Sequence, residues 1–433
     1  MAEVHVVQQS VLFGTELRRR RLDADLTLTD LSKLVHYSKG QLSKVERGIK
    51  APSRELARLC DTALNARGQL AALVDERPPR EGPEEKSGDD EVWLMQLSAD
   101  GRSWFQPMSR RQAMAAGAAS IAGMSIGGLT NPPAGKDGAL LGASRSLFDY
   151  YRQLGQTVAP NVLIPALIAQ THTLRELSSR ADTRTRQGLL KLGSRYAEYV
   201  GWLVQETGNE QAALWWTQRA VDLAAAGGDY DLAAYALVRR ALVTLYREDA
   251  AQTVELAQRA QDDRVPPRIR GLAAQREAQG HALAGDYDAC MRALDRAREL
   301  LAGAVPDSDA PVIGTTNLPD PVGMVFGWCL YDLGRPADAA ESMETQLSKV
   351  SPQAMRTQVR YGLRCALAHA AAGEVDRACD LATRLLGSVA AVGSATIAAD
   401  LRALARVLAR HPRNRSVRDL APELGTTLQI ITP

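Results

Sequence analysis

The chain has 433 residues, which at about 100–200 residues per domain predicts two to four domains. Hydrophobic residues make up 45% of it and charged residues 24%, which excludes a chain that is disordered throughout. The net charge of +2 argues against a general nucleic-acid binder, but the charge is unevenly distributed. Residues 14–58 form a basic segment with eleven basic and six acidic groups, and residues 78–92 form an acidic segment with two basic and six acidic groups. The five cysteines form no C-x-x-C pair and no apolar signal opens the chain, so we expect a cytoplasmic protein without disulfides.

Residues 10–76 are predicted to form a domain of five helices. The segment 11–23 has apolar residues at helical spacing and is its first helix. The side chains expected to face the core from this helix are Val11, Leu12, Leu17 and Leu22. Thr27 is suited to cap the second helix, because Asp30 stands at the capping-box position three residues later.

A three-residue turn separates this second helix from a third. Ser38 is expected to cap the third helix, and Gly48 suits the left-handed conformation that ends it. The apolar residues expected to pack between the two helices are Leu31, Leu34, Val35, Leu42 and Val45. Two short helices joined in this way can place the second in the major groove of DNA. The polar residues expected to contact phosphates or base edges are Thr27, Thr29, Ser38, Lys39, Gln41, Ser43, Lys44, Arg47 and Lys50.

The stretch TLTDLSKLVHYSKGQLSKVERGIKAPS resembles the helix-turn-helix of the Cro and phage-repressor (XRE) family, above all in the pattern S-x-x-x-L-S-x-V-E-R-G-x-x-x-P. The resemblance implies that three of the polar residues reach bases: Lys39, Gln41 and Lys44. Contact with phosphate or water alone is the alternative for each. It also implies that Glu46 pairs with Arg21. The family often begins the second helix with a phosphate-binding Gln, where this chain has Leu28, so Thr27 or Thr29 is expected to make that contact.

Residues 77–139 are predicted to be an acidic linker followed by a connector of small residues. The stretch 78–92 holds three prolines and two glycines without apolar periodicity. Farther on, Arg110 and Arg111 precede 24 uncharged residues in a pattern that resembles a twin-arginine export signal. Its position deep in the chain and its Ala and Gly content favour a connector instead. Docking on the repeats and a membrane tether are the alternatives.

Residues 140–433 are predicted to be a solenoid of helical hairpins. Four glycines (Gly208, Gly285, Gly334 and Gly373) each have a small residue seven positions before and another five positions after. Glu248 stands in place of the glycine in a fifth, weaker copy. The small residues let two helices approach, the glycine turns the chain, and neighbouring hairpins must stack to bury their apolar faces. The pattern resembles the tetratricopeptide repeat (TPR).

Stacked hairpins of the TPR kind form a superhelix whose first helices line a concave groove. By that resemblance, the groove-facing residues are expected to be Arg195, Glu198, Trp202, Gln205, Tyr235, Gln275, Gln279, Met324, Trp328, Tyr331 and Arg360. Amide side chains suit an extended peptide backbone, and aromatic ones supply anchor pockets. We therefore expect a short peptide as ligand, with ordinary packing between repeats as the alternative for each residue.

The chain contains no P-loop, no G-x-S-x-G and no H-E-x-x-H, so we expect no catalytic, cofactor or metal site. As a whole it resembles actinobacterial XRE-type regulators with C-terminal helical repeats. The resemblance implies an all-α, cytoplasmic transcription regulator, with a homodimer on a palindromic double-stranded DNA operator and a ligand sensed by the repeats. The alternative is an adaptor whose repeats bind a protein such as a sigma factor or a kinase.

Overall fold

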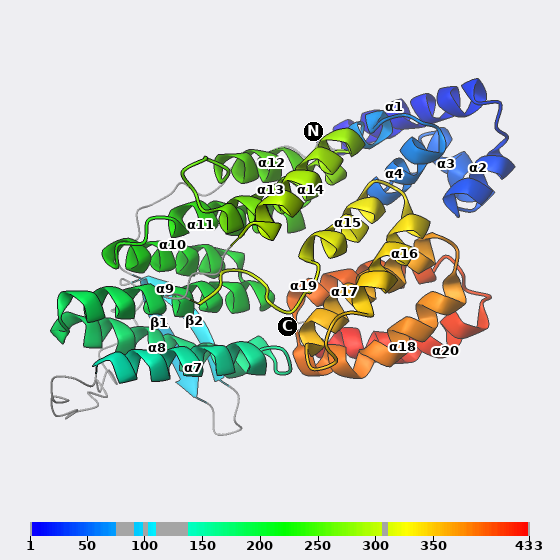
Figure 1. Cartoon of the computed structure of the whole chain (residues 1–433). Coiled ribbons are helices and arrows are strands. Elements are labelled where there is room, and N and C mark those ends of the chain that lie inside the picture. The colour runs from blue at the N-terminus through cyan, green and yellow to red at the C-terminus, as the bar shows by residue number, and fades with distance from the viewer. Residues whose placement is uncertain (1, 75–90, 98–102, 110–136, 305–310, 432–433) are drawn as a thin grey trace.

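The computed structural model describes residues 2–74, 91–97, 103–109, 137–304 and 311–431 (Figure 1). Helices dominate these residues, with a helix-turn-helix at the N-terminal end and an array of helical hairpins at the C-terminal end, which confirms the predicted fold class. An antiparallel pair of strands was not predicted: β1 (Glu91–Leu97) and β2 (Ser103–Ser109). Their aromatic and branched residues favour strands, a local preference that the composition around them obscured. The uncharged stretch after Arg111 lies outside the described residues.

The N-terminal region consists of α1 (Ala2–Asp23), α2 (Leu28–Val35), α3 (Lys39–Glu46), α4 (Arg54–Ala63) and the single turn α5 (Gln69–Ala72). The two helices α2 and α3 begin where the sequence predicted, whereas α1 begins at Ala2, ahead of the predicted start at residue 11. Thr27 and Asp30 form a reciprocal capping box at α2, and the Ser38 hydroxyl accepts a hydrogen bond from the backbone N–H of Gln41 at α3. Gly48 has φ +69° and ends the helix-turn-helix. Local chemistry therefore fixes the boundaries of both short helices.

The face that α1 turns to the core differs from the prediction. The side chain of Val11 lies outside the described part of the chain. Leu17 is fully buried as predicted and so is Phe13, whereas Leu12 and Leu22 are 59% and 55% exposed. The reason is a close approach to α3, because a Cβ atom on Gly14 would lie 2.4 Å from the carbonyl oxygen of Val45. Leu34 is exposed rather than packed between the helices, and the larger apolar residues of this core also include Leu31, Val35, Leu42, Val45, Leu56, Leu59 and Leu70.

The C-terminal region is built from five hairpins flanked by two helices at each end. Two helices precede the hairpins: α7 (Asp137–Leu154) and α8 (Pro160–Arg180). The hairpins are α9 (Thr183–Glu206) with α10 (Glu210–Ala226), α11 (Leu232–Tyr246) with α12 (Ala250–Arg259), α13 (Pro267–Leu283) with α14 (Tyr287–Ala302), α15 (Pro321–Asp332) with α16 (Pro336–Leu347), and α17 (Met355–Ala371) with α18 (Val375–Val392). They are followed by α19 (Ala395–Leu408) and α20 (Arg415–Ile431).

The five predicted turn positions adopt the conformation that the repeat requires. The glycines at 208, 285, 334 and 373 have φ between +77° and +88°, and Glu248 has φ +58°. The small residues that precede and follow them are buried between the two helices of each hairpin. At Gly327, for example, a Cβ atom would lie 2.7 Å from the Cγ of Met343. The predicted repeats are thus confirmed.

The superhelix curves until its two ends meet (Figure 1). Glu206, at the end of α9, accepts hydrogen bonds from the hydroxyls of Ser394 (2.6 Å) and Thr396 (3.0 Å) beside α19. Arg356 of α17 donates to the carbonyl oxygen of Gly155, which follows α7. This closure turns the concave face of the array into a partly enclosed pocket. No helix of the described residues combines the length and the apolar character needed to cross a membrane.

Candidate DNA interface and ligand pocket

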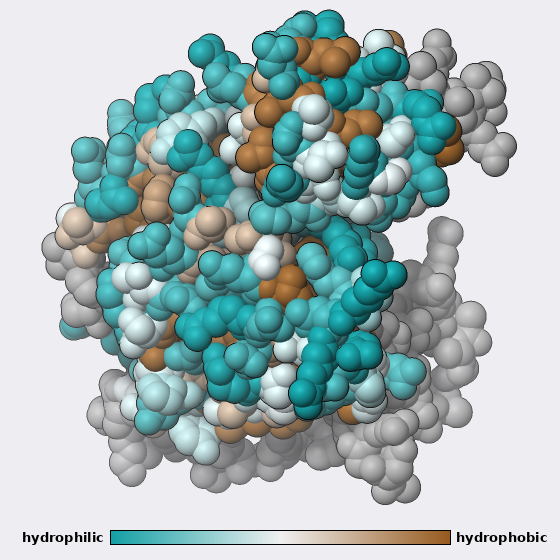
Figure 2. All heavy atoms as spheres, turned by 90° about the vertical axis from the view of Figure 1, so that its right-hand side faces the viewer, coloured by the Kyte–Doolittle hydropathy of each residue, from teal (hydrophilic) through white to brown (hydrophobic). Residues whose placement is uncertain are grey.

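The predicted DNA-contact residues all keep accessible side-chain surface. Seven of them are exposed: Thr27, Thr29, Ser38, Lys39, Lys44, Arg47 and Lys50. Gln41 and Ser43 are half-buried. Figure 2 shows the side of the molecule on which α2 and α3 lie, where a largely hydrophilic surface is interrupted by hydrophobic patches. The third helix thus presents cationic and hydroxyl donors, groups that hydrogen-bond to phosphates and base edges.

The predicted pair between Arg21 and Glu46 is present and almost buried. Arg21 donates from Nε and Nη2 to the two carboxylate oxygens of Glu46, at 2.7 and 3.0 Å, and from Nη1 to the carbonyl of Leu26. The hydrogen bond to Glu46 raises the pKa of Arg21. This bidentate pair ties α1 to the end of α3 and so fixes the tilt of the helix that would enter the groove.

The helix-turn-helix region is docked on the repeats through α4. Arg58 donates to Asp332 at 3.2 Å, and the Thr62 hydroxyl donates to the carbonyl of Leu333 at 2.8 Å. Arg54 donates to both the carbonyl and the carboxylate of Glu248, each at 2.8 Å. The side chains of Arg58 and Asp332 are only 11% and 8% exposed, so this ion pair lies in a water-poor contact.

The turn glycines of three successive repeats also take part in this contact. A Cβ atom on Gly334 would lie 2.5 Å from the carbonyl oxygen of Arg58, and one on Gly285 would lie 2.8 Å from the Cα of Gly68. A Cβ atom on Gly373 would lie 2.8 Å from the ring of His36, in the turn between α2 and α3. These glycines therefore both turn the hairpins and admit the N-terminal region.

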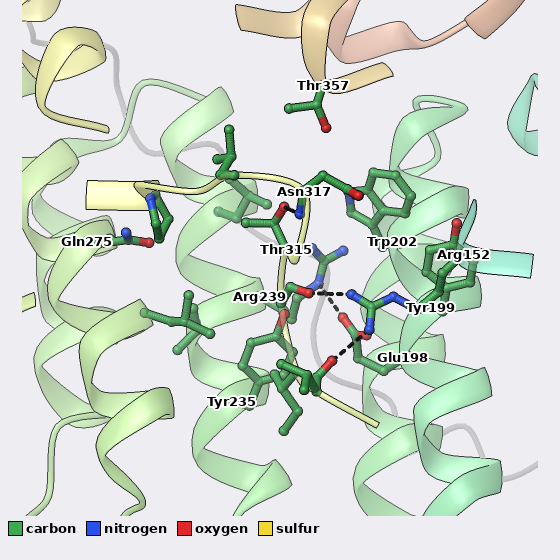
Figure 3. Close-up of a pocket in the computed structure, with 18 of the residues that line it drawn as sticks. Arg152, Glu198, Tyr199, Trp202, Tyr235, Arg239, Gln275, Thr315, Asn317 and Thr357 are labelled. Carbon is green, nitrogen blue, oxygen red and sulfur yellow. Dashed lines mark hydrogen bonds and ion pairs between the residues drawn. The ribbon is translucent and has the colours of Figure 1, made fainter. Parts of the chain in front are cut away.

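A cavity of about 190 Å³ lies inside the closed superhelix. It is lined by the first helices of all five hairpins, by α7 and by residues 312–318. Seven of the predicted groove residues line it: Arg195, Glu198, Trp202, Tyr235, Gln275, Trp328 and Arg360. Figure 3 shows Trp202 and Gln275 on opposite sides of this pocket, with the segment carrying Thr315 and Asn317 passing between them. The structure thus brings together side chains from five repeats.

Four predicted groove residues do not line the cavity. Gln205 is buried behind it and accepts a hydrogen bond from Arg239 at 3.0 Å. Met324 packs in an apolar cluster, Tyr331 packs against neighbouring helices, and Gln279 is buried away from the cavity. Each is three or four residues from a residue that does line it, so it lies on nearly the same face of its helix but one turn farther along the axis.

Many lining residues were not predicted, and their charged members are all arginines: Arg152, Arg239, Arg276 and Arg356. Tyr199 and Thr357 are among the uncharged residues that were not predicted. Helical spacing offered a signal for two of the arginines, since Arg239 follows Tyr235 by one turn and Arg356 precedes Arg360 by one turn. Residues 312–318 had no such signal. They are held by Arg152, which donates to the carbonyls of Val312 (2.9 Å) and Gly314 (2.7 Å).

Aromatic rings form the walls between these cations. Tyr199 and Trp202 stack with centroids 5.4 Å apart, and Trp328 meets Tyr361 edge to face at 6.3 Å. Arg356 lies over the ring of Trp202. Burial raises the pKa of the Glu206 carboxyl, but Arg360 and Arg356 beside it outweigh that effect and lower the pKa overall. The pocket thus combines flat apolar surfaces with positive charge.

A second cluster, Glu344, Cys365 and His369, has the residue types of a metal site. The two ring nitrogens of His369 already lie 2.6 Å from Glu374 and 3.0 Å from Glu344. Burial raises the pKa of the Cys365 thiol to about 12, so it is not a ready thiolate ligand. These contacts account for the cluster as a hydrogen-bonded link between α16 and α17.

Comparisons with known proteins support the N-terminal assignment. A family model described as a helix-turn-helix domain matches residues 12–74, which span α1 to α5. The N-terminal region is therefore a helix-turn-helix domain, a type of domain that binds DNA. No curated protein matches the chain. Among solved structures, the crystal structure of a Rap protein complexed with competence and sporulation factor is similar over 68% of this chain and 98% of that one, with 14% identity and a TM-score of 0.40.

Proposed function

We propose that this protein is a transcription regulator in which a ligand in the repeat pocket, a short peptide, controls how the helix-turn-helix binds its operator. The exposed basic surface of α3 supports DNA reading, and the aromatic and amide groups of the pocket support a peptide ligand. A homodimer would place one α3 on each half of a palindromic operator. The protein is proposed to be cytoplasmic and to have no enzymatic activity.

The observation that carries the proposal is a short chain of contacts from the pocket to α4. Trp328 lines the pocket, and its indole N–H donates to Oδ2 of Asp332 at 3.0 Å. The other oxygen of Asp332 accepts from Arg58 of the helix-turn-helix domain. A ligand that moves the Trp328 ring would therefore displace the carboxylate on which α4 is docked.

This contact is well suited to switching. Burial raises the pKa of Asp332 even though Arg58 and Arg364 lie beside it, so its charged form is less favoured than that of an exposed carboxylate. On the other side of α4, Glu55 pairs with Arg410, whose guanidinium lies over the ring of Tyr37 in the turn before α3. A shift of α4 would move this turn and with it α3. The equilibrium between the conformation of the dimer that binds the operator and the one that does not would then change.

The first test is whether the full chain selects a DNA sequence and responds to a natural small molecule. Selection from a random DNA pool is expected to enrich a palindrome, and fluorescence anisotropy gives the affinity for it. Adding the fraction below about 1 kDa from an extract of the source organism is expected to change that affinity at least fivefold, and peptidase treatment of the fraction is expected to abolish the effect. No enriched sequence, together with a stoichiometric protein partner in a pull-down, would favour the adaptor.

A further inference from the structure

The arginines of the pocket outnumber the carboxylates that form ion pairs with them. Six arginines line it, and three carboxylates of the described chain pair with them. Arg195 pairs with Asp229 at 2.9 Å, Arg239 with Glu198 at 3.5 Å, and both Arg356 and Arg360 share Glu206; these residues are therefore largely compensated. Arg152 is held by backbone carbonyls.

The guanidinium of Arg276 is the exception. It lines the pocket from α13 and makes no ion pair or hydrogen bond with any other residue that the structure describes. Burial lowers its pKa, and the neighbouring Arg360 adds to that effect, although Tyr361 opposes it. The Arg276 side chain is half-buried at the pocket wall, and a cation that is partly withdrawn from water without a counter-charge is unfavourable, so a bound anion would stabilise it.

The unpaired hydrogen-bonding atoms of the pocket point to the same ligand chemistry. The side-chain N–H₂ of Gln275 is buried without an acceptor in the described chain, and this residue is only 2% exposed. The Nε atoms of Arg195 and Arg360 are likewise buried without acceptors there. All three groups are donors, and the unpaired Tyr199 hydroxyl can also donate, so a ligand that satisfies them must present acceptor atoms, which an anionic oxygen group supplies.

We infer that the pocket takes an anionic ligand whose carboxylate or phosphate oxygens accept hydrogen bonds from Arg276 and Gln275. This rests on the proposed function, since it names the chemistry of the ligand that the regulator would sense. The planar guanidinium matches two oxygens of such a group at once. The apolar part of the ligand packs against Trp202 and Trp328, and in a peptide the anion is the C-terminal carboxylate.

Two dyes of nearly the same shape test the inference on the full chain. 1-Anilinonaphthalene-8-sulfonate is an anionic aromatic probe, and N-phenyl-1-naphthylamine is its uncharged counterpart. We expect saturable binding of the anionic dye, at least tenfold tighter than that of the neutral dye and weakened by added salt. Arg276→Gln is expected to weaken the anionic dye at least tenfold and the neutral dye less than twofold. Arg276→Lys, which keeps the charge, is expected to fall between wild type and Arg276→Gln.

The control variant is Arg292→Gln, which removes an exposed arginine from α14, outside the pocket, and is expected to change neither affinity. Thermal unfolding of each variant checks that the fold is intact. Pentapeptides with a free C-terminal carboxylate are expected to displace the dye at lower concentration than the same peptides amidated, and inorganic phosphate as competitor identifies a phosphate preference.

The outcomes separate this inference from the proposed function. Equal affinities for the two dyes, or an Arg276→Gln variant that binds the anionic dye as tightly as wild type, would overturn the anionic preference while leaving a working pocket. Equal displacement by free and amidated peptides, with no displacement by phosphate, would overturn it as well. If neither dye binds saturably, the pocket itself is not a ligand site, and the proposed function fails with it.

Discussion

Glu206 is the single charged residue on which the closure of the repeat array depends most directly. Its side chain is almost wholly buried, and it joins α9 to the start of α19 while facing Arg356 and Arg360. Removing one partner of a buried ion pair leaves the other charge without compensation, which costs more than the pair itself contributes. The two arginines would then be left beside a cavity that already holds excess positive charge.

We expect Glu206→Gln to lower the free energy of unfolding by about 3–5 kcal/mol, measured by chemical denaturation. The pKa of Glu206 is lowered from 4.5 in the folded state, so its stabilisation is complete above about pH 4.5 and is lost as the pH falls through the folded-state pKa. The difference in the free energy of unfolding between wild type and variant should therefore become smaller in acid. Glu255→Gln, at an exposed site, is the control and is expected to change stability by less than about 0.5 kcal/mol. A gap that is constant with pH would contradict the role of the charge.

Lys44 is the residue on α3 where base reading is tested most simply. Its side chain is exposed and makes no hydrogen bond within the described domain. We expect Lys44→Ala to weaken binding to the selected operator by about 1–3 kcal/mol and to relax the preference at one base position. Lys33→Ala, which removes an exposed lysine of α2, should have a smaller effect. If binding is weakened equally on all DNA sequences, Lys44 contacts phosphate rather than a base.

At the scale of elements, the turn of a repeat is also the docking point of another domain. Gly334 ends one hairpin helix with φ +77° and lies against the backbone of Arg58. A side chain at this position would be strained by the backbone conformation and would also meet α4. The same arrangement recurs at Gly285 and Gly373, so the spacing of the repeats sets the spacing of the contacts that hold the helix-turn-helix domain.

Gly334→Ala is therefore expected to destabilise the chain by about 1–3 kcal/mol and to raise amide hydrogen exchange in α4. Gly387→Ala is the matched control, because Gly387 is an exposed helical glycine of α18 with open space around its Cβ position. It should be neutral or stabilising by up to about 1 kcal/mol. Unchanged exchange in α4 of Gly334→Ala would show that the turn does not hold the domain.

Local features of the elements were predictable from the sequence, whereas contacts between distant elements were not. Thr27, Ser38 and the turn glycines were recognised because capping and left-handed turns depend on a few neighbouring residues. The pair between Arg58 and Asp332 joins residues 274 positions apart, and the sequence around either residue gives no indication of it. Arg276 was not predicted for the same reason, because its lack of a counter-charge depends on where the folded array places the carboxylates.

At the scale of the whole molecule, one curved array performs two tasks. Its concave side encloses the pocket, and its turns carry the helix-turn-helix domain (Figure 1). Seven groove residues could be predicted because stacked hairpins expose their first helices on one side, but the degree of curvature that closes the pocket could not. Trp328 takes part in both, since it lines the pocket and donates a hydrogen bond to Asp332, the residue that pairs with Arg58. Coupling between ligand and DNA is therefore expected to pass through this pair.

The most direct test measures the operator affinity of wild type and of Asp332→Asn, each with and without the low-molecular-mass extract fraction. Asp332→Asn keeps the shape of the side chain and removes the charge that Arg58 contacts. We expect the fraction to change the affinity of wild type at least fivefold and that of the variant less than twofold, while the variant still prefers the operator over random DNA. An equal response of both proteins, or no response of wild type, would contradict the proposed coupling of the pocket to the DNA-binding domain.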